Sequence, residues 1–446
     1  MKTFKSGIHP QDNKSGTKAN PIIKALTPNR VTLPLQQNLG CPNDPLVKIG
    51  EEVKLGQKIA DATRLVSAPL HSPISGKIIQ IAKHPNPCGY AVASIIIEKA
   101  GESQDWSNPG RNIDSIPADE IIKIVREAGI VGLGGAAFPT HVKLSPPKGK
   151  KIDALILNGC ECEPYITADY RLMLERAGDI IEGAKLLARA VGAENIYFGI
   201  ENNKKDCILK ITSTAALQKN IAVIALETKY PQGGEKMLIK AILNREVPSG
   251  GLPLDVGVIV NNIGTALAVY DAVKFGKPLF ERVVTVTGSG VKTPQNLLAR
   301  IGTSFNELIG QAGGLTDDAA KIIMGGPMTG LAVSNLDLPI VKATNCILVL
   351  NRDDAKMFEE KECIRCGRCI KSCPMGLLPN YLADFSKLKD WDRAREYNVV
   401  DCIECGSCAY VCPSRINLVQ YFKLTKFEVL SRTKKLPQSE EKKVCR

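Results

Sequence analysis

The chain has 446 residues, enough for about three domains, and its 44% hydrophobic and 23% charged residues are typical of a globular protein. No apolar run approaches the roughly 20 residues that cross a bilayer, and the first residues lack a secretory signal, so we expect a cytoplasmic protein that contacts a membrane only through partners. The net charge is +12, but aromatic residues make up only 5% and are not interleaved with basic ones, which argues against nucleic-acid binding.

The first part of the chain is predicted to be rich in short strands. Between residues 30 and 100, apolar and polar residues alternate and turn residues recur at close spacing. The stretch "APLHSPISGKI" resembles the barrel-sandwich fold of lipoyl and biotinyl carrier domains. The modifiable lysine of those carriers is missing here, so residues 1–112 are predicted to be a β-rich, barrel-sandwich-like domain without a swinging arm.

An α/β domain is predicted for residues 113–278. The segment "PADEIIKIVREAG" has helical spacing, with Pro117 near its start and Gly129 at its end. Strand-like runs such as "KIDALILNG", "IAVIALET" and "GVIVNN" then alternate with helical runs such as "GTALAVYDAVKFG". This alternation indicates a sheet packed against helices.

The loop "GIVGLGGAAFPTHVKL" follows the first predicted helix of this domain. Gly132, Gly134 and Ala137 have the G-x-G-x-x-A spacing of a dinucleotide-binding fingerprint, but that fingerprint follows a strand and opens a helix. Its glycines would still let backbone N–H groups approach an anion or a flat ring. By itself the loop is equally compatible with a generic tight turn.

The segment "ILNGCECEPYITADYRLM" follows the predicted strand "KIDALIL". Cys160 and Cys162 alternate with Glu161 and Glu163, which could form a metal site, a redox-active thiol pair or part of a ligand cradle. On an extended segment both thiols would point the same way. The end of a strand is where open α/β sheets bind ligands.

A small unit of short strands around one helix is predicted for residues 279–345, from runs such as "ERVVTVTGSGV", "SFNELIGQAGG" and "KIIMGGPMTG". Residues 346–430 are predicted to be helical. The remaining residues, 431–446, are predicted to be a basic tail. From Ser414 to Arg446 the chain has nine Lys/Arg against three Asp/Glu, and this stretch is either a solvated end or a docking surface for an acidic protein or anionic lipid headgroups.

Eight of the fifteen cysteines lie in two blocks of the helical segment, "ECIRCGRCIKSCP" and "DCIECGSCAYVCP". Each block has the C-x2-C-x2-C-x3-C-P spacing of two-cluster ferredoxins, a spacing that the bacterial ferredoxins exemplify. Structural zinc would require four ligands in two pairs, so we predict two [4Fe–4S] clusters. The fourth cysteine of each block should bind the other cluster, which gives the ligand sets Cys363, Cys366, Cys369 and Cys412 for one cluster, and Cys402, Cys405, Cys408 and Cys373 for the other. The residues between the blocks are predicted to be helical, which resembles the α-helical ferredoxin type.

Four motifs in the central part together resemble the flavin- and NADH-binding subunit of respiratory complex I and its hydrogenase relatives. They are "GLGGAAFPTHVKL", "NGCECEP", "YPQGGEKML" and "VIVNNIGTAL", and the resemblance spans about residues 117–330, including a β-grasp (SLBB-like) unit. In that family the motifs cradle FMN and stack NADH over it. The family usually has an arginine where this chain has Leu133, which leaves the mode of phosphate binding open.

The resemblance implies a role for each matching position. Gly132, Gly134 and Lys143 would approach the FMN phosphate and ring. Asn158, Glu161 and Glu163 would line the flavin and the nicotinamide, and Phe138 would stack on the dinucleotide. The remaining positions would complete the pocket and hold the ribityl-phosphate end: Tyr230, Gly233, Glu235, Val260, Asn261, Asn262 and Thr265. In this interpretation Cys160 and Cys162 are small side chains packed beside the flavin.

The order of the domains, with "GIHP" near the start, resembles the RnfC/RsxC family of Rnf-type membrane complexes over nearly the full length. The fold class implied is multi-domain α/β: a barrel-sandwich-like domain, an FMN/NADH-binding domain, an SLBB-like unit and a helical two-cluster domain. The function implied is a peripheral oxidoreductase subunit of an ion-translocating ferredoxin:NAD oxidoreductase, on the cytoplasmic side of the inner membrane. Expected partners are NADH and other subunits, one of them ferredoxin-like.

The implied mechanism exchanges a hydride between NAD(H) and FMN and passes single electrons through the two clusters, with no catalytic residue beyond the cofactor pocket. Two other functions fit the same motifs: a soluble cobalamin reductase with a similar domain order, and a cluster-bearing adaptor that binds no nucleotide.

Overall fold

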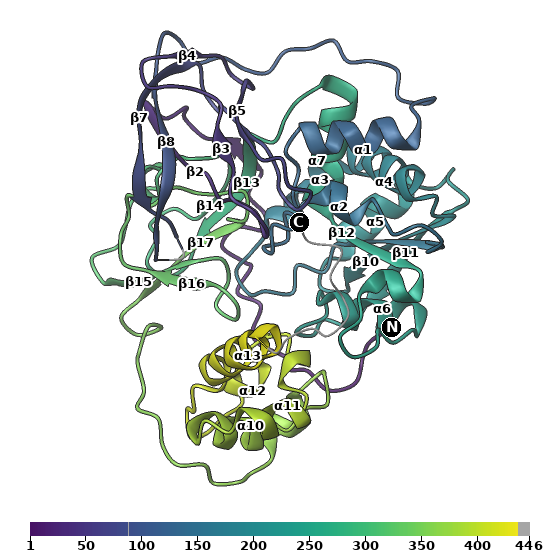
Figure 1. The fold of residues 1–446 in the computed structure, drawn as a ribbon, viewed down its shortest axis with the longest axis vertical. Coiled ribbons are helices and arrows are strands. Elements are labelled where there is room, and N and C mark those ends of the chain that lie inside the picture. Colours follow the sequence, from purple (N-terminus) through teal and green to yellow (C-terminus); the bar gives the residue numbers. More distant parts are fainter. Residues whose placement is uncertain (88, 436–446) are drawn as a thin grey trace.

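A computed structural model describes residues 1–87 and 89–435 of the chain. Two strand-rich units and an α/β domain lie together, and a separate helical domain is joined to them by an extended linker (Figure 1). The docking role proposed for residues 414–446 falls partly on residues 436–446, which lie outside the described part. Among the described residues, none of the helices is both long and apolar enough to span a bilayer.

The N-terminal domain consists of two small antiparallel sheets. One has the order β2-β8-β7-β4, with bounds Arg30–Pro34, Ala91–Lys99, Gly76–Pro85 and Glu52–Val53. The other has the order β3-β5-β6, with bounds Asp44–Pro45, Lys58–Asp61 and Leu70–His71. The consecutive isoleucines of β8, Ile95 to Ile97, are fully buried, so this strand is covered on both faces.

The α/β domain is built on a four-stranded parallel sheet with the order β11-β10-β9-β12. The strands are Ile221–Leu226, Asn195–Glu201, Ala154–Asn158 and Val258–Asn262. Its helices are α1 (Ala118–Glu127), α2 (Thr140–Lys143), α3 (Ala168–Glu175), α4 (Ala177–Val191), α5 (Lys205–Thr214), α6 (Glu235–Leu243) and α7 (Ile263–Phe275), with a 3-10 turn at Pro253–Val256. Glycine is required at position 183 on α4, because a Cβ there would lie 2.0 Å from the carbonyl oxygen of Ala266 on α7.

A third unit contains a six-stranded sheet with the order β1-β14-β13-β17-β15-β16. The strands are Ile22–Lys24, Gln295–Arg300, Glu281–Thr287, Cys346–Asn351, Ala319–Met324 and Leu331–Val333, and the helix is α8 (Phe305–Gln311). Ser304 and Glu307 form a reciprocal capping box that starts α8. This matches the predicted unit of short strands around one helix.

Two strands of this sheet come from outside the predicted unit of residues 279–345. β1 belongs to the N-terminal segment and pairs in parallel with β14, and β17 pairs with β13 and β15. The boundary predicted at residue 346 assigned β17 to the helical domain, whereas its pairing places it in the sheet.

The C-terminal domain is helical. Its helices are α9 (Arg368–Ser372), α10 (Pro379–Lys387), α11 (Trp391–Glu396), α12 (Ser407–Tyr410) and α13 (Leu418–Lys435), with a 3-10 turn at Val399–Asp401. A separate core that includes Leu382, Trp391 and Phe422 holds these helices together. Figure 1 shows this domain at the far end of the molecule from the N-terminal sheets.

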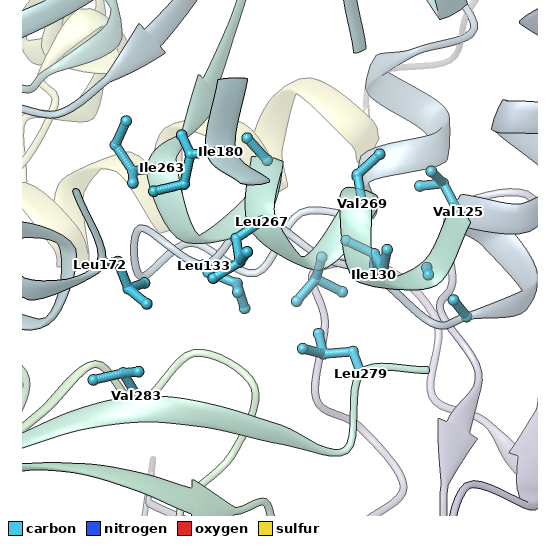
Figure 2. Packing of buried hydrophobic residues seen from close by; sticks show 14 of the residues in the cluster. Val125, Ile130, Leu133, Leu172, Ile180, Ile263, Leu267, Val269, Leu279 and Val283 are labelled. Atoms are coloured by element: carbon cyan, nitrogen blue, oxygen red, sulfur yellow. The ribbon is translucent and has the colours of Figure 1, made fainter. Parts of the chain in front are cut away.

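The α/β domain and the six-stranded sheet share one apolar core. Leu133, Leu267 on α7, Leu279, and Val283 on β13 belong to one cluster of buried side chains, and Figure 2 shows Leu133 and Leu267 facing Val283 from the opposite side of this core. Leu133 therefore anchors the glycine-rich loop in the core between the two domains.

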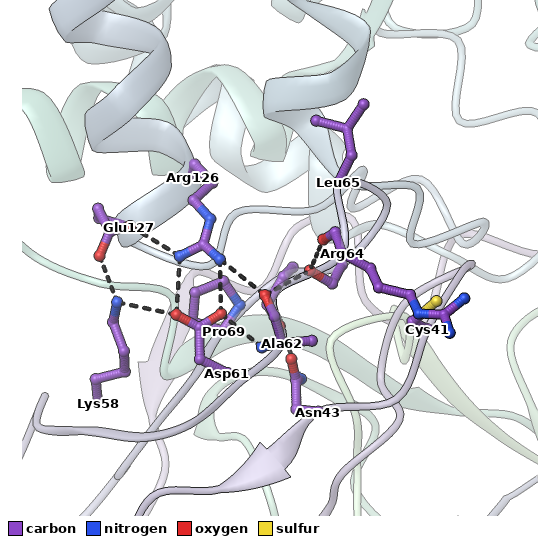
Figure 3. A network of polar contacts seen from close by, with 12 residues as sticks. Cys41, Asn43, Lys58, Asp61, Ala62, Arg64, Leu65, Pro69, Arg126 and Glu127 are labelled. Carbon is purple, nitrogen blue, oxygen red and sulfur yellow. Dashed lines mark hydrogen bonds and ion pairs between the residues drawn. The ribbon is translucent and has the colours of Figure 1, made fainter. Parts of the chain in front are cut away.

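A polar network joins the N-terminal domain to α1. Arg126 donates two hydrogen bonds of 2.8 Å to the carboxylate of Asp61, and Lys58 bridges Asp61 and Glu127 (Figure 3). Partial burial alone would raise the pKa of Asp61, but the bonds from Arg126, Ala62 and Lys58 lower it below its ordinary value.

Candidate functional site

The motif residues gather at the carboxyl edge of the parallel sheet. Asn158 ends β9 and Asn262 ends β12, and the two are direct partners in the register of these neighbouring strands. The Asn262 side chain caps α7 by accepting from the backbone N–H groups of Gly264 and Thr265. Strand ends and a helix N-terminus therefore converge at this edge, which is where open α/β sheets bind ligands.

The glycine-rich loop closes over this edge from the side of α1. Gly132 N–H donates to the carbonyl of Phe138, Leu133 N–H donates to the Thr265 hydroxyl at 2.9 Å, and Arg282 of β13 donates to the carbonyl of Leu133 at 3.1 Å. Gly134 and Gly135 are exposed, and a side chain at Gly135 would meet nothing within 4 Å. Hydrogen bonds thus fix the loop at Leu133, whereas the glycines that follow are exposed and have free space beside them.

Lys143, at the end of α2, reaches the same edge. Its ammonium group donates to the carbonyl of Val260 at 2.8 Å and pairs with Glu235 at 2.5 Å. Glu235 is the first residue of α6, so a cation lies beside a helix N-terminus. A cation and a helix N-terminus both favour an anionic group, and in this structure the anion that Lys143 contacts is the Glu235 carboxylate.

Asn158 is held by protein contacts. Its amide donates to the carbonyl of Gly233 at 2.8 Å, and its carbonyl oxygen accepts from Cys160 N–H at 3.2 Å. Gly233 has no room for a side chain without displacement, because a Cβ would lie 3.3 Å from Asn158 and from the Cys162 sulfur. The motifs "NGCECEP" and "YPQGGEKML" therefore meet at this point.

Glu161 has a left-handed backbone with φ of +43°, so the segment after β9 turns and is not extended. The expectation that the two thiols point the same way is wrong for this reason. The Glu161 carboxylate accepts from the N–H groups of Asp169 and Tyr170 at 2.7 and 3.2 Å, at the start of α3. Burial raises the pKa of Glu161 to about 8, although nearby Lys14 opposes the shift.

Glu163 contacts the SLBB-like unit. Its carboxylate accepts from the N–H groups of Met328 and Thr329 at 3.1 and 2.9 Å, and from the Thr329 hydroxyl. Burial raises the pKa of Glu163. The side chain fixes the loop of residues 325–330 against the sheet edge.

The two cysteines of this segment point to different neighbours. Cys160 is fully buried in the core beneath β9, with its sulfur 3.6 Å from the carbonyl of Gly199. The Cys162 sulfur accepts from Gly233 N–H at 3.4 Å. Burial raises the pKa of Cys162 to about 12 and that of Cys160 well above its ordinary value, so both thiols stay protonated at neutral pH.

Two amide side chains at the edge are buried with unused hydrogen-bonding atoms. The Nδ2 atom of Asn261 and both amide atoms of Gln232 have no partner among the described residues. Buried amides without partners are costly, so such atoms often mark where a bound group supplies the missing contact. Together with the open glycines and Lys143, these atoms form a donor set that fits a polar, phosphate-bearing ring such as FMN.

Tyr230 connects this edge to the helical domain. Its hydroxyl donates to the carbonyl of Cys405 at 2.6 Å, and a Cβ on Gly406 would lie 3.0 Å from the carbonyl of Met328. Gly7 N–H also donates to the carbonyl of Ser372, and the Ser249 hydroxyl donates to Asp401, so several separate segments of the chain touch the cysteine-bearing domain.

The helical domain encloses two hollows, each lined by four cysteines. One is lined by Cys363, Cys366, Cys369 and Cys412, and the other by Cys373, Cys402, Cys405 and Cys408. Each hollow is thus lined by the same four cysteines that were predicted as one ligand set. Three of them come from one block and the fourth comes from the other block. Four thiols around one hollow are the donor set that a [4Fe–4S] cluster requires.

The backbone repeats in the two blocks. Arg365 and Gly367 have φ of +53° and +70°, and Glu404 and Gly406 have φ of +55° and +83°. A short helix follows in each case, α9 and α12. The left-handed residues turn each loop around its hollow.

The N-terminal segment also reaches the site, which sequence reasoning did not anticipate. Lys14 is buried, and its ammonium group donates to the carbonyls of Glu163 and Ile166 at 2.9 and 2.5 Å. Ile8 pairs with Tyr230 as an isolated bridge. The "GIHP" motif was the available signal, but its spatial neighbours could not be inferred from one sequence.

Four family models match the chain. They are the RnfC barrel sandwich hybrid domain over residues 2–102, the Nuo51 FMN-binding domain over residues 125–271, the SLBB domain over residues 283–332 and the 4Fe-4S dicluster domain over residues 355–413. They confirm the predicted fold class and the predicted FMN and iron–sulfur cofactors.

Similar proteins match almost the entire chain. The C subunit of the proton-translocating ferredoxin:NAD(+) oxidoreductase complex of Clostridium ljungdahlii is 46% identical over 96% of this chain and 94% of its own length. The C subunit of the Na(+)-translocating complex of Acetobacterium woodii is 43% identical, over 97% and 98%. The corresponding subunit of the ion-translocating oxidoreductase complex of Rhodobacter capsulatus is 41% identical, over 96% and 84%.

Proposed function

The chain belongs to the RnfC family, the C subunits of ion-translocating ferredoxin:NAD(+) oxidoreductase complexes, and from this we propose that it is the peripheral subunit that exchanges electrons with NAD(H). The observation that carries the proposal is the direct contact between the two halves of the site. The Tyr230 hydroxyl at the sheet edge bonds to the backbone of Cys405 in a cysteine-lined hollow.

FMN would be held by the residues that meet at the sheet edge. The open glycines after Leu133 and the unpartnered Asn261 amide would contact its polar atoms, and Lys143 would offset its phosphate charge. When bound here, FMN would supply the link between two-electron hydride exchange with NAD(H) and one-electron exchange with the clusters. Gly132, Gly134, Phe138, Asn158, Tyr230, Gly233, Glu235, Val260, Asn262 and Thr265 complete the proposed pocket.

The chain's own residues orient and enclose this site. Thr265 and Arg282 fix the glycine-rich loop at Leu133, so the exposed glycines are preorganised. Glu163 holds residues 325–330 at the edge through the N–H groups of Met328 and Thr329. No nucleophile or acid–base pair is required for this chemistry.

The eight cysteines would bind two [4Fe–4S] clusters in the ligand sets that line the two hollows. The set with Cys405 lies nearest the flavin side because Tyr230 and Met328 contact its loop. The partners we propose are NADH and other subunits of the complex, including a ferredoxin-like one, with the chain on the cytoplasmic side of the inner membrane.

Rapid mixing with NADH tests the function. Anaerobically reconstituted protein loaded with FMN should lose its flavin absorbance, and the iron–sulfur absorbance should fall afterwards. Cys405→Ala should still lose flavin absorbance but should fail to pass electrons on to the clusters.

Lys143→Met should bind FMN about tenfold more weakly, since one charge-assisted contact is worth about 1.5 kcal/mol.

Two results would favour the other functions. A protein that binds no flavin and does not react with NADH would be a cluster-bearing adaptor. A protein that reduces cobalamin with NADH and is recovered free of membrane subunits would be a soluble reductase.

A further inference from the structure

The two cysteine blocks have the same spacing but opposite charge. The first contains Arg365, Arg368 and Lys371, whereas the second contains Glu404 and no basic residue between its cysteines. Since the backbones match, this difference does not arise from the requirements of cluster binding.

Arg365 and Glu404 occupy equivalent positions, with φ of +53° and +55°. Glu404 is used inside the domain, because its carboxylate pairs with Lys426 at 2.6 Å. Arg365 is exposed, and no carboxylate of the described residues lies within ion-pair distance of it. The charge at the first block is therefore available to a partner.

Other exposed cations are next to, or within two residues of, residues that line the same hollow. None of them forms an ion pair within the described part of the chain: Lys361, Arg368, Lys371 and Arg415. With Arg365 they outnumber the two exposed carboxylates of the same stretch, Glu359 and Glu362. A surface of this kind attracts an acidic partner.

Large apolar side chains are exposed in the same segment of the chain. Met357 is 88% exposed, Phe358 60% and Ile364 68%, and Ile364 lines the hollow itself. The Arg415 guanidinium lies 4.3 Å from the centre of the Phe358 ring. Apolar side chains and arginines within a basic rim are the usual composition of a protein interface.

The two hollows face different surroundings. The hollow with Cys405 contacts Tyr230 and Met328 of the flavin side. In the other hollow Cys363 and Cys366 are exposed. A second redox protein could approach the first-block cluster closely, whereas the second-block cluster is covered on the flavin side.

We propose that the surface formed by Met357, Phe358, Ile364, Arg365, Arg368 and Lys371 is the docking site for an acidic, one-electron iron–sulfur protein of the ferredoxin type. The inference rests on the proposed function, because it places the exchange of electrons with an outside partner on one surface of the helical domain. Opposite charges steer the encounter, and the apolar side chains bring the partner's cluster near Cys363 and Cys366.

The test uses the holoprotein and a small acidic two-cluster ferredoxin, reduced and freed of reductant, in stopped-flow mixing at low and high ionic strength. The variant is R365E/R368E/K371E, and Glu404 shows that glutamate is accepted at the first position. The matched control, K83E/K210E/K219E, makes the same charge change at exposed lysines elsewhere.

The control should react with the ferredoxin within about twofold of the unmodified protein. The surface variant should react at least about tenfold more slowly at low salt and should lose most of its salt dependence. Equal rates and equal salt dependence in the two variants would overturn the proposal.

A second variant keeps the proposal testable if the first loses its cluster. Met357→Ser with Phe358→Ser lies outside the cysteine block and should also slow the ferredoxin reaction, with iron content unchanged. Unchanged rates in this variant would contradict the docking site. Failure of the proposed function gives a different result, because NADH would then leave the flavin of the unmodified protein oxidised.

Discussion

Glu161 and Glu163 differ in what they stabilise, although they are two residues apart. Glu161 caps α3, and Glu163 binds the loop of residues 325–330. Both carboxylates are satisfied by backbone N–H groups in this structure. Their expected role beside flavin and nicotinamide thus remains a prediction, and their contacts define how to test it.

Glu163→Gln should weaken the reaction of NADH with the flavin by roughly tenfold while cluster content stays unchanged. The amide can accept only at its oxygen, and its NH2 group would face N–H donors of Met328 or Thr329. A buried donor left unpaired costs about 1–3 kcal/mol, enough to loosen the loop. Stopped-flow absorbance and iron analysis would measure the two effects.

Thr329→Val is the matched control, because it removes only the hydroxyl that Glu163 accepts from. A smaller effect than that of Glu163→Gln is expected. If Glu163→Gln reacts at the unmodified rate, the loop does not contribute to the reaction with NADH.

Cys162→Ala should retain FMN, both clusters and reactivity with NADH. Its thiol is protonated at neutral pH because burial raises its pKa to about 12, and its one hydrogen bond is a weak contact with Gly233 N–H. Flavin and iron content of the purified variant would check this. Loss of either cofactor would instead assign the thiol a direct role.

At the scale of elements, the contact between β5 and α1 depends on ionised carboxylates. Asp61 has a folded pKa below its ordinary value of 3.8, so its contribution to stability is complete above that pH and is lost as the pH falls through the folded pKa. Glu127 shows the same direction. The contact between the two domains should therefore weaken only in acid.

Asp61→Asn, Arg126→Met and the double variant measure this contact. The coupling between the two side chains should be about 1 kcal/mol, since the pair is bidentate but partly exposed. Hydrogen exchange of residues 118–127 at neutral pH reports it. Additive effects of the two single variants would show that the pair contributes nothing beyond its separate parts.

The elements with strong periodicity could be predicted from the sequence. The helix of residues 118–127 and the alternation of the α/β domain follow directly from apolar spacing. The strands β1 and β17 could not be assigned to their sheet in the same way. Their partners are far away in sequence, and pairing of that kind leaves no local pattern.

The candidate site was predictable in part for the same reason. The cysteine spacing predicts the ligand sets, because the chemistry of the cluster fixes the spacing of its ligands along the chain. The turn at Glu161 and the buried Lys14 were not readable, since a left-handed glutamate and a contact with an N-terminal lysine depend on tertiary structure.

At the scale of the whole molecule, the N-terminal segment ties the domains together. It pairs with β11 and Tyr230, bonds to Ser372 of the helical domain and ends in the six-stranded sheet as β1. Lys14→Met would leave the carbonyls of Glu163 and Ile166 without this donor, at about 1–3 kcal/mol. Faster hydrogen exchange around residues 159–170 is expected, and unchanged exchange would show that the segment does not stabilise the site.

The central claim is that electrons from NADH reach two clusters through a flavin within this one chain. Anaerobic titration of the reconstituted protein with NADH, followed by optical and EPR spectra, tests it in a single sample. The flavin absorbance should bleach, and signals of reduced [4Fe–4S] clusters should appear as NADH is added. A sample with both clusters but no flavin spectrum, or one that NADH leaves oxidised, would contradict the account.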